Sequence, residues 1–240
     1  MLKAIFFDVA GTLILTRERI GFSYARLAQQ YGLAADDKAV GAAFRRAFNA
    51  APGLAFGPGH DAHELRRLER EWWRRVVVET FVGVGEFSDF DGYFAALFDF
   101  LGDPANWKVD PEAMQLLVRL KERGHSLGVI SNFDYRVYGI LEGLGLDRYF
   151  DSMTISSEAG WAKPATQIFR AALERHAIEP REALHVGDSE DTDLAGAQTA
   201  GIAAVLLDRK APDRCSIAGS SARVTVLAAV LDAVDQMTFT

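Results

Sequence analysis

Side chains that could do chemistry follow several of the short apolar segments in this sequence. Asp8 closes the first segment, and Ser131 and Asn132 follow a later one. Lys163 lies in the loop after a third, and Asp188 follows a fourth. Ligands of open parallel sheets bind at the carboxyl ends of the strands. If the segments are strands, we therefore expect these side chains to gather at one edge of a sheet.

This set of residue types is suited to phosphoryl chemistry. A carboxylate such as Asp8 can act as a nucleophile, and Asp188 could hold Mg²⁺ together with it, because this ion prefers oxygen ligands. The metal would also allow an anionic nucleophile to approach an anionic phosphate. Ser131 and the backbone amide near Asn132 could bind phosphoryl oxygens, and Lys163 could neutralise the charge that develops.

The apolar segments are typical of strands buried on both faces, and helical patterns separate the later ones. Their alternation predicts βαβ units and an α/β fold with a parallel sheet. For the helix expected after residue 110, Asp110 is the predicted N-cap and Pro111 suits the first turn. The expected strands are residues 2–9, 126–130, 153–155, 183–186 and 203–207, and the expected helices are residues 111–123, 136–144, 165–176 and 193–200.

Residues 16–107 have a different texture, with almost no strand-like segment. Helices are expected at residues 19–31, 37–49, 63–81 and 90–101. A helical stretch of this length is too long for a loop between a strand and a helix. We therefore predict an inserted helical domain that folds as its own unit and moves relative to the rest.

Composition narrows the class of protein. The 240 residues suit one large domain or a domain with an insert, and 49% hydrophobic residues provide for a core. A net charge of -7 disfavours nucleic-acid and acidic-membrane partners. The single cysteine, Cys215, excludes an intrachain disulfide and a cysteine-cluster zinc site. We expect no signal peptide and no membrane-spanning segment, and a cytoplasmic location.

Four segments in order carry a family resemblance: FFDVAGTL, VISNFD, GWAKP and HVGDSEDTDLAGAQTAG. Together they resemble the haloacid dehalogenase-like hydrolases, in the subfamily with a helical cap inserted after the first motif. The wording ISNFD, EAGWAKP and REWWRRVVVETF is similar to the branch that includes rhythmically expressed gene product homologues. The resemblance implies a Rossmann-like core of residues 1–15 and 108–240, and a helical cap of residues 16–107 over the site.

The resemblance also implies roles for the residues that match the motifs. Asp8 matches the aspartate nucleophile that forms a covalent intermediate, and Thr12 matches the threonine that supports its loop. Ser131, with Asn132 beside it, matches the phosphate-binding hydroxyl. Lys163 matches the lysine of the third motif. These matches imply catalytic roles for Asp8 and Lys163, and substrate binding by the other three residues.

Mg²⁺ is the cofactor that the resemblance implies. Asp188 matches a metal ligand and Asp193 matches the second acidic position of the fourth motif. Asp8 and the backbone carbonyl of Ala10 complete the set. Asp193 could instead cap the following helix, because aspartate is a favoured N-cap.

Ala10 departs from the pattern of the family's phosphatases, which resembles Asp-x-Asp-x-Thr. The second aspartate there is the general acid and base, whose help is worth about 10²–10⁴-fold. Alanine keeps the carbonyl but carries no proton. Asp134 or a residue of the cap could substitute for the missing carboxylate.

Three functions therefore stay open. The first is a Mg²⁺-dependent phosphatase of a small phosphorylated metabolite, acting through an aspartyl-phosphate on Asp8. The second is a catalytically weak or non-catalytic protein that binds a phosphate ligand. The third is a phosphonatase-like or dehalogenase-like hydrolase. A phosphonatase resembling the known ones needs a cap lysine, and the only one is Lys38. Dehalogenases resembling the known ones need no metal.

The remaining polar residues are expected to have ordinary roles. His185 lies in an apolar segment and is predicted to be a satisfied core histidine. Of the adjacent pair Trp72 and Trp73, at least one should lie in the core of the cap, while the other faces the substrate cleft. Residues 64–79 alternate arginine with glutamate, which favours a solvated helix face with i,i+4 pairs. Its charged members are Glu64, Arg66, Arg67, Glu69, Arg70, Glu71, Arg74, Arg75 and Glu79.

Overall fold

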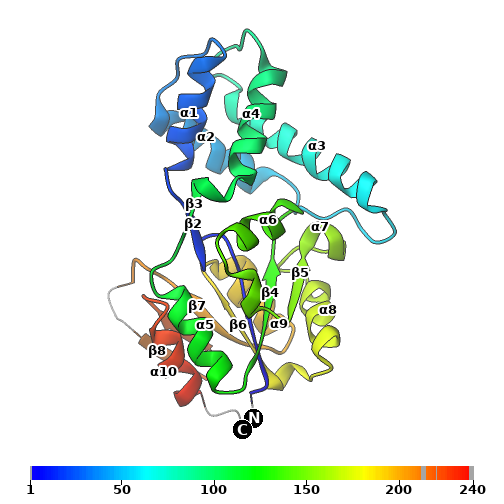
Figure 1. Ribbon diagram of the computed structural model, residues 1–240, viewed down its shortest axis with the longest axis vertical. Coiled ribbons are helices and arrows are strands. Elements are labelled where there is room, and N and C mark those ends of the chain that lie inside the picture. Colours follow the sequence, from blue (N-terminus) through cyan, green and yellow to red (C-terminus); the bar gives the residue numbers. More distant parts are fainter. Residues whose placement is uncertain (1, 212–214, 220, 238–240) are drawn as a thin grey trace.

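The computed structural model describes residues 2–211, 215–219 and 221–237. Its centre is a seven-stranded sheet with the strand order β5-β4-β1-β6-β7-β9-β8 (Figure 1). The pairs from β5 through β9 are parallel, and β8 runs antiparallel to β9 at one edge. This confirms the predicted α/β class. The strands are β1 (Ala4–Phe7), β4 (Ser126–Ser131), β5 (Ser152–Ile155), β6 (Ala183–Gly187), β7 (Ala203–Leu207), β8 (Cys215–Ala218) and β9 (Ser221–Val224). The side chain of Cys215 lies outside the described part.

Helices cover both faces of this sheet. In β1, Ile5 and Phe7 pack with α5 (Ala113–Glu122), α6 (Arg136–Gly143) and α10 (Ala229–Gln236). Ala4 and Phe6 point to the opposite face and pack with α8 (Thr166–His176) and α9 (Ala195–Thr199). Because successive residues of a strand face opposite sides, a strand covered on both faces is apolar throughout, which is the pattern of residues 4–7. We call the sheet and these helices the sheet unit.

The second part of the molecule is the helical unit, residues 20–102. It consists of α1 (Ile20–Gln30), α2 (Asp37–Ala50), α3 (Ala62–Phe81) and α4 (Phe90–Gly102). Figure 1 shows these four helices gathered at one end of the molecule. The side chains of Asp36, Asp61 and Asp89 accept a hydrogen bond from the first turn of α2, α3 and α4, respectively. The interior of the unit is rich in aromatic rings, among them Tyr24 and Tyr93.

Two short strands join the units. β2 (Ile14–Thr16) pairs antiparallel with β3 (Trp107–Val109), and in Figure 1 they lie between the helical unit and the sheet. The predicted boundaries at residues 15 and 108 therefore fall inside these strands. The remaining elements are short: η1 (Pro104–Asn106), η2 (Asp147–Tyr149), α7 (Ser156–Ala159), η3 (Pro180–Glu182) and η4 (Glu190–Leu194), a π-helical turn. No helix in the described part of the chain is long and apolar enough to cross a membrane.

Two helix starts differ from expectation. α5 begins at Ala113 with Glu112 as its N-cap residue, so the predicted start at Pro111 is wrong. The Asp110 carboxylate still accepts a hydrogen bond from the Glu112 amide, 3.0 Å away, within a turn that precedes the helix. The helix expected from residue 193 is preceded by η4, whose N-cap residue is Ser189. In both places a turn precedes the α-helix, and a side chain of that turn accepts a hydrogen bond from one of the turn's own backbone amides.

Candidate active site

The motif residues meet at the carboxyl ends of three neighbouring strands. Asp8 follows β1 directly, Ser131 ends β4, and Asp188 follows β6. β1 lies between β4 and β6, and pairs in parallel with both. Parallel pairing brings the carboxyl ends of the three strands to the same edge. Asp8, Ser131 and Asp188 are therefore neighbours although they lie far apart along the chain.

Asp8 is buried and is held on one side only. Its Oδ1 atom accepts hydrogen bonds from Ser131 Oγ at 2.9 Å and from Lys163 Nζ at 2.8 Å. No donor of the described residues reaches Oδ2. Burial raises the pKa of Asp8, and the Lys163 ammonium only partly opposes that rise. The geometry leaves one carboxylate oxygen of a fixed side chain free to contact a ligand.

Lys163 is buried between two carboxylates. Its Nζ atom lies 2.8 Å from Asp8 Oδ1 and 2.5 Å from Asp193 Oδ1. Burial alone would lower the pKa of this lysine, but the charges of Asp193 and Asp8 outweigh it and raise the pKa. The ammonium is therefore charged and can stabilise an anion at this edge of the sheet.

Asn132 fixes the backbone of Lys163. Its Nδ2 donates to the Lys163 carbonyl at 2.9 Å, and its Oδ1 accepts from the Lys163 amide at 2.7 Å. The side chain of Asn132 thus positions the lysine. Substrate binding near Asn132 stays a prediction, and it would involve the backbone amide there and not the Asn132 side chain.

Asp193 is a hub of hydrogen bonds. Its Oδ1 contacts Lys163 and His185 Nε2, the latter at 2.8 Å, and its Oδ2 accepts from the Ser189 amide at 3.0 Å. Burial opposes ionisation, but the Lys163 ammonium and the bond from His185 keep the pKa of Asp193 below its usual range. The helix-cap alternative for Asp193 is wrong, since the Ser189 hydroxyl accepts from the Thr192 amide and so takes that position.

His185 differs from the satisfied core histidine that was expected. It is fully buried in β6, but its Nε2 atom belongs to the active-site network through Asp193. Its Nδ1 atom has no hydrogen-bond partner among the described residues. Burial lowers the pKa of His185. In the sequence, the signal for this role was the carboxylate of Asp193, eight residues after His185.

Asp188 is supported by the loop that follows β1. Thr12 Oγ1 donates to Asp188 Oδ1 at 3.2 Å. Gly11 has a φ of +94°, and a Cβ atom there would lie 2.4 Å from Asp188 Oδ2. Only glycine allows this approach, a requirement that the sequence analysis missed. Desolvation, with the charges of Asp8 and Asp193, raises the pKa of Asp188 to about 6.

The donor set fits a divalent cation. Ligand atoms of Asp8, Asp188 and Asp193 lie within 4.8 Å of one another. Lys163 is the only cation that bonds to these carboxylates among the described residues, so negative charge is in excess. Burial is the main cause of the raised pKa values of Asp8 and Asp188, and the charge of a neighbouring carboxylate adds to the rise in each. No donor of the described residues bonds to the carbonyl of Ala10, the fourth predicted ligand.

Asp134 is not placed to replace the missing carboxylate of residue 10. It is fully buried, and Arg136 Nε and Nη2 bind its two oxygens at 2.8 and 2.7 Å. Trp73 Nε1 of the helical unit donates to Oδ2 at 2.6 Å. With both oxygens occupied by the Arg136 guanidinium, this carboxyl group has no free oxygen to present to a leaving group.

Arg209 is a further supporting residue that the sequence analysis missed. Its Nη1 atom donates to the Gly11 carbonyl, and Nη2 donates to the Thr12 carbonyl at 3.1 Å and to Asp110 Oδ2 at 2.7 Å. Arg209 thereby ties the loop after β1 to the residue that follows β3. No motif spacing marks it, because its partners lie about 100 and 200 residues earlier.

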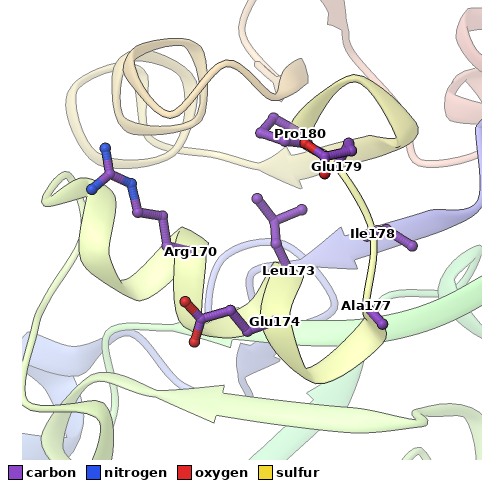
Figure 2. Close-up of a pocket in the computed structure, with 7 residues that line it drawn as sticks. All are labelled: Arg170, Leu173, Glu174, Ala177, Ile178, Glu179 and Pro180. Atoms are coloured by element: carbon purple, nitrogen blue, oxygen red, sulfur yellow. The ribbon is translucent and has the colours of Figure 1, made fainter.

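A surface hollow elsewhere does not belong to this site. Figure 2 shows it between the second half of α8 and the segment that leads to η3. It is lined by Arg170, Leu173, Glu174, Ala177, Ile178, Glu179 and Pro180. None of the motif residues lines it.

Comparison with known proteins gives sequence relatives over most of the chain. Haloacid dehalogenase-like hydrolase domain-containing protein 3 of Mus musculus is 35% identical over 217 residues, which are 88% of this chain and 84% of the relative. The rhythmically expressed gene 2 protein of Drosophila melanogaster is 29% identical over 219 residues, which are 87% and 84% of the two chains. These relatives confirm the predicted similarity to the branch that includes rhythmically expressed gene product homologues.

Solved structures show the same fold at lower identity. The L-2-haloacid dehalogenase of Xanthobacter autotrophicus matches 99% of this chain and 100% of its own, with a TM-score of 0.73 and 16% identity. A HAD phosphatase of Thermococcus onnurineus matches 97% and 98%, with a TM-score of 0.65 and 22% identity. The sequence pattern of one family, described as haloacid dehalogenase-like hydrolase, matches residues 2–201. With its motif residues assembled at one edge of a parallel sheet, the chain belongs to the haloacid dehalogenase-like hydrolases.

Proposed function

We propose that this hydrolase is a Mg²⁺-dependent phosphatase of small phosphorylated metabolites, with Asp8 as the nucleophile. One observation carries the proposal. Oδ1 of Asp8 is held by Ser131 and Lys163, no donor of the described residues reaches Oδ2, and ligand atoms of Asp8 and Asp188 lie within 4.8 Å of each other. A nucleophile needs this combination of a fixed position and an available oxygen.

Each neighbouring side chain has a defined task in this reaction. Asp8 Oδ2 attacks phosphorus, a bond forms between the two, and the bond to the leaving oxygen breaks. Ser131 and Lys163 orient the attacking carboxylate, and the Lys163 ammonium offsets charge on the phosphoryl oxygens. Water then hydrolyses the aspartyl-phosphate and regenerates Asp8.

The residues that would hold the cation are Asp8, Asp188 and the carbonyl of Ala10, with Asp193 close by. When bound, Mg²⁺ would neutralise the negative charge that carboxylates and a phosphate ester bring together. Thr12 and Gly11 keep the Asp188 carboxylate at its place for this purpose. The Asp193 oxygens are already engaged by Lys163, His185 and Ser189, so its part is to position Lys163.

Ala10 decides which substrates react well. Without a carboxylate at residue 10 and with Asp134 bound to Arg136, neither position can protonate the leaving oxygen. Aryl and acyl phosphates expel a stable anion and need no such proton, whereas sugar alkoxides do. Water attack on the aspartyl-phosphate also lacks a base. We therefore expect a preference for good leaving groups and accumulation of the covalent intermediate.

The second candidate is a weakly catalytic or non-catalytic phosphate-binding protein, which the same lack of a proton donor favours. A phosphonatase is less well supported, because Lys38 is exposed in the first turn of α2. A dehalogenase is supported by the fold alone, and the carboxylate cluster at Asp8 and Asp188 favours a metal-dependent reaction.

The test is a panel of phosphate esters with and without Mg²⁺, measured by release of phosphate. The panel includes p-nitrophenyl phosphate, an acyl phosphate and several sugar phosphates. Turnover that requires Mg²⁺, with an initial burst of p-nitrophenol equal to the enzyme concentration, supports the phosphatase. A raised melting temperature with phosphate esters and no turnover of any of them supports the binding protein.

A further inference from the structure

One face of α3 contacts the sheet unit directly after the phosphate-binding motif. Arg66, Glu69 and Trp73 are spaced i, i+3 and i+7, so they share one side of the helix. The Arg66 guanidinium lies 5.0 Å from the centre of the Tyr135 ring, and Tyr135 N donates to Glu69 Oε1 at 3.2 Å. Trp73 Nε1 donates to Asp134 Oδ2 at 2.6 Å. We call this set of contacts the α3 joint.

From the sheet unit, Arg136 contacts Phe98 of the helical unit. Its Nη1 donates to the Phe98 carbonyl at 2.9 Å, and its guanidinium lies 3.6 Å from the centre of the Phe98 ring. The same guanidinium binds both oxygens of Asp134 and lies 5.4 Å from the centre of the Trp73 ring. The joint is therefore built from partners of both units, and separating the units must break it.

Glu69 is the imperfect member of the joint. It is only 1% exposed, and its Oε2 atom has no hydrogen-bond partner among the described residues. The buried hydroxyl of Ser157, at the start of α7, is also without a partner there. A buried carboxylate oxygen and a buried hydroxyl left in this way are costly. The Ser157 hydroxyl favours the ionised form of Glu69 only in part, and a proton on Glu69 would remove the buried charge.

The charges around Glu69 point the same way. Asp134 forms a buried ion pair with Arg136, so this guanidinium is already engaged and the Asp134 charge still acts against ionisation of Glu69. From α7, Glu158 adds a further negative charge, whose Oε2 accepts from the Tyr138 hydroxyl of α6 at 2.7 Å. The nearest arginines of α3 are turned to aromatic rings, Arg66 to Tyr135 and Arg70 to Phe94 and Phe98. An ionised Glu69 would thus be a buried charge without a counter-ion.

We propose that the helical unit closes on residues 134–136 with the uptake of one proton at Glu69. The chain passes between the units only through the segments of β2 and β3, so opening at the α3 joint leaves the two units connected. In the open state Glu69 meets water and ionises, and in the closed state it is buried and protonated. Ser131 and Asn132, which hold Asp8 and Lys163, lie just before the segment that the joint contacts.

The titration of Glu69 agrees with this direction. Burial raises its pKa from 4.5 to about 7, and the charges of Asp134 and Glu158 add to the rise. The Tyr135 amide and the nearby Ser157 hydroxyl oppose it only in part. A group whose pKa is higher in the closed state favours closure at low pH. Closure is therefore strongest below about pH 4.5, weakens as the pH rises, and levels off above about pH 7.

The amide of Tyr135 reports closure directly, because its hydrogen bond goes to Glu69. We expect its protection against hydrogen exchange, corrected for the intrinsic exchange rate, to fall about tenfold between pH 5.5 and pH 7.5. The measurement is hydrogen exchange of the full chain, followed at the peptide that contains Tyr135. The Val129 amide in β4, within the sheet, is the internal reference and should keep its protection.

Two pairs of variants sharpen the test. Glu69→Gln imitates the protonated acid, so protection of Tyr135 should stay high and independent of pH. The control Glu71→Gln, at an exposed residue that pairs with Arg67, should behave as wild type. Trp73→Phe should lower protection about tenfold at each pH, since it removes a bond to a charged group. The control Trp72→Phe also shortens a tryptophan ring, but the hydrogen bond that it removes goes to the Pro52 carbonyl inside the helical unit.

The proposal is overturned if Tyr135 protection in the wild type does not change between pH 5.5 and pH 7.5. It is also overturned if Glu69→Gln keeps the pH dependence of the wild type, or if Trp73→Phe leaves protection unchanged. Should Glu69→Gln fail to fold, the wild-type profile alone decides. The measurement does not depend on turnover, so its outcome is separate from that of the phosphatase proposal.

Discussion

The sheet unit and the helical unit bury side chains of different kinds. At the edge of the sheet, Asp8, Lys163 and Asp193 are all buried, and Lys163 is bonded to both carboxylates. The interior of the helical unit is instead a cluster of aromatic rings, such as Phe81 and Tyr93, whose centres are 5.4 Å apart. Glu69 is the one buried carboxylate among its described residues, and it lies at the face that meets the sheet unit.

This difference assigns the chemistry to the sheet unit and the closure of the site to the helical unit. A buried charge is tolerated only where partners are placed around it, so the sheet edge has little freedom to vary. Aromatic packing depends on shape and area, so the helical unit can keep its fold while its outer surface changes. The two kinds of interior predict different responses to substitution, from the largest effect to the smallest.

Loss of the nucleophile should have the largest effect. Asp8→Asn keeps the shape of the side chain and removes its nucleophilic oxygen, so turnover should fall about 10³-fold or more. The measurement is Mg²⁺-dependent hydrolysis of p-nitrophenyl phosphate. The melting temperature should not fall, because the buried charge is also removed. Retained turnover would place the chemistry elsewhere in the molecule.

A matched pair of leucines should show whether the units fold separately. Leu97→Ala in α4 and Leu117→Ala in α5 each empty a buried site, and each should cost about 2–5 kcal/mol. Hydrogen exchange should assign the loss from Leu97→Ala to residues 20–102 and leave β1 and β4 protected. Leu117→Ala should expose β1 and β4. Equal loss of protection throughout in both variants would mean that the molecule unfolds as one unit.

Metal binding should follow the ionisation of Asp188. Its pKa is raised to about 6, and a proton competes with the cation for the same oxygens. Mg²⁺ affinity measured by calorimetry should therefore be level above about pH 7 and fall by up to about tenfold per pH unit below about pH 6.

Two variants locate this effect. Asp188→Asn should weaken Mg²⁺ binding about tenfold or more at pH 7.5, and it should reduce the rise in melting temperature that Mg²⁺ produces. Asp191→Asn changes an exposed aspartate three residues away and serves as the control. Equal Mg²⁺ affinity in the two variants would move the metal away from Asp188.

Restoring the acid should give the smallest of the four effects. Ala10→Asp should raise turnover of sugar phosphates about tenfold, a modest part of the range for general acid catalysis, and should change aryl phosphates less. Rates with the two leaving groups, in wild type and variant, measure this. Fast alkyl-phosphate turnover by the wild type, at about 10 s⁻¹, with no gain in the variant would show that another residue supplies the proton.

The regular elements of both units could be predicted because their signals are local. The apolar segments at residues 183–186 and 203–207 became β6 and β7, and each helix of the helical unit lies within a few residues of its expected range. β2 and β3 were missed because each has three residues and its partner lies about 90 residues away. β8, β9 and α10 were missed, although the apolar residues from Val224 to Val234 carry the signal for α10.

The main error of the sequence-based prediction was the exposure of Glu69 at the α3 joint. The alternation of arginine and glutamate in α3 predicted a solvated face, and Arg67 with Glu71 forms the expected exposed pair. Glu69 lies in the same pattern but is buried against Tyr135 and Ser157. Helical periodicity shows which residues share a side of α3, but it does not say that a second unit covers that side.

The family and the order of the chemical groups along the chain follow from the amino-acid sequence alone. Asp8, Ser131, Lys163 and Asp188 follow strands whose apolar character is a local property, and parallel strands end at a common edge. Only the tertiary structure decided what each group contacts. Asn132 holds Lys163, Arg209 binds the loop after β1, and Asp134 is neutralised by Arg136. The physical reason is that burial and hydrogen bonding depend on side chains brought together from distant parts of the chain, and no spacing in the sequence encodes those distances.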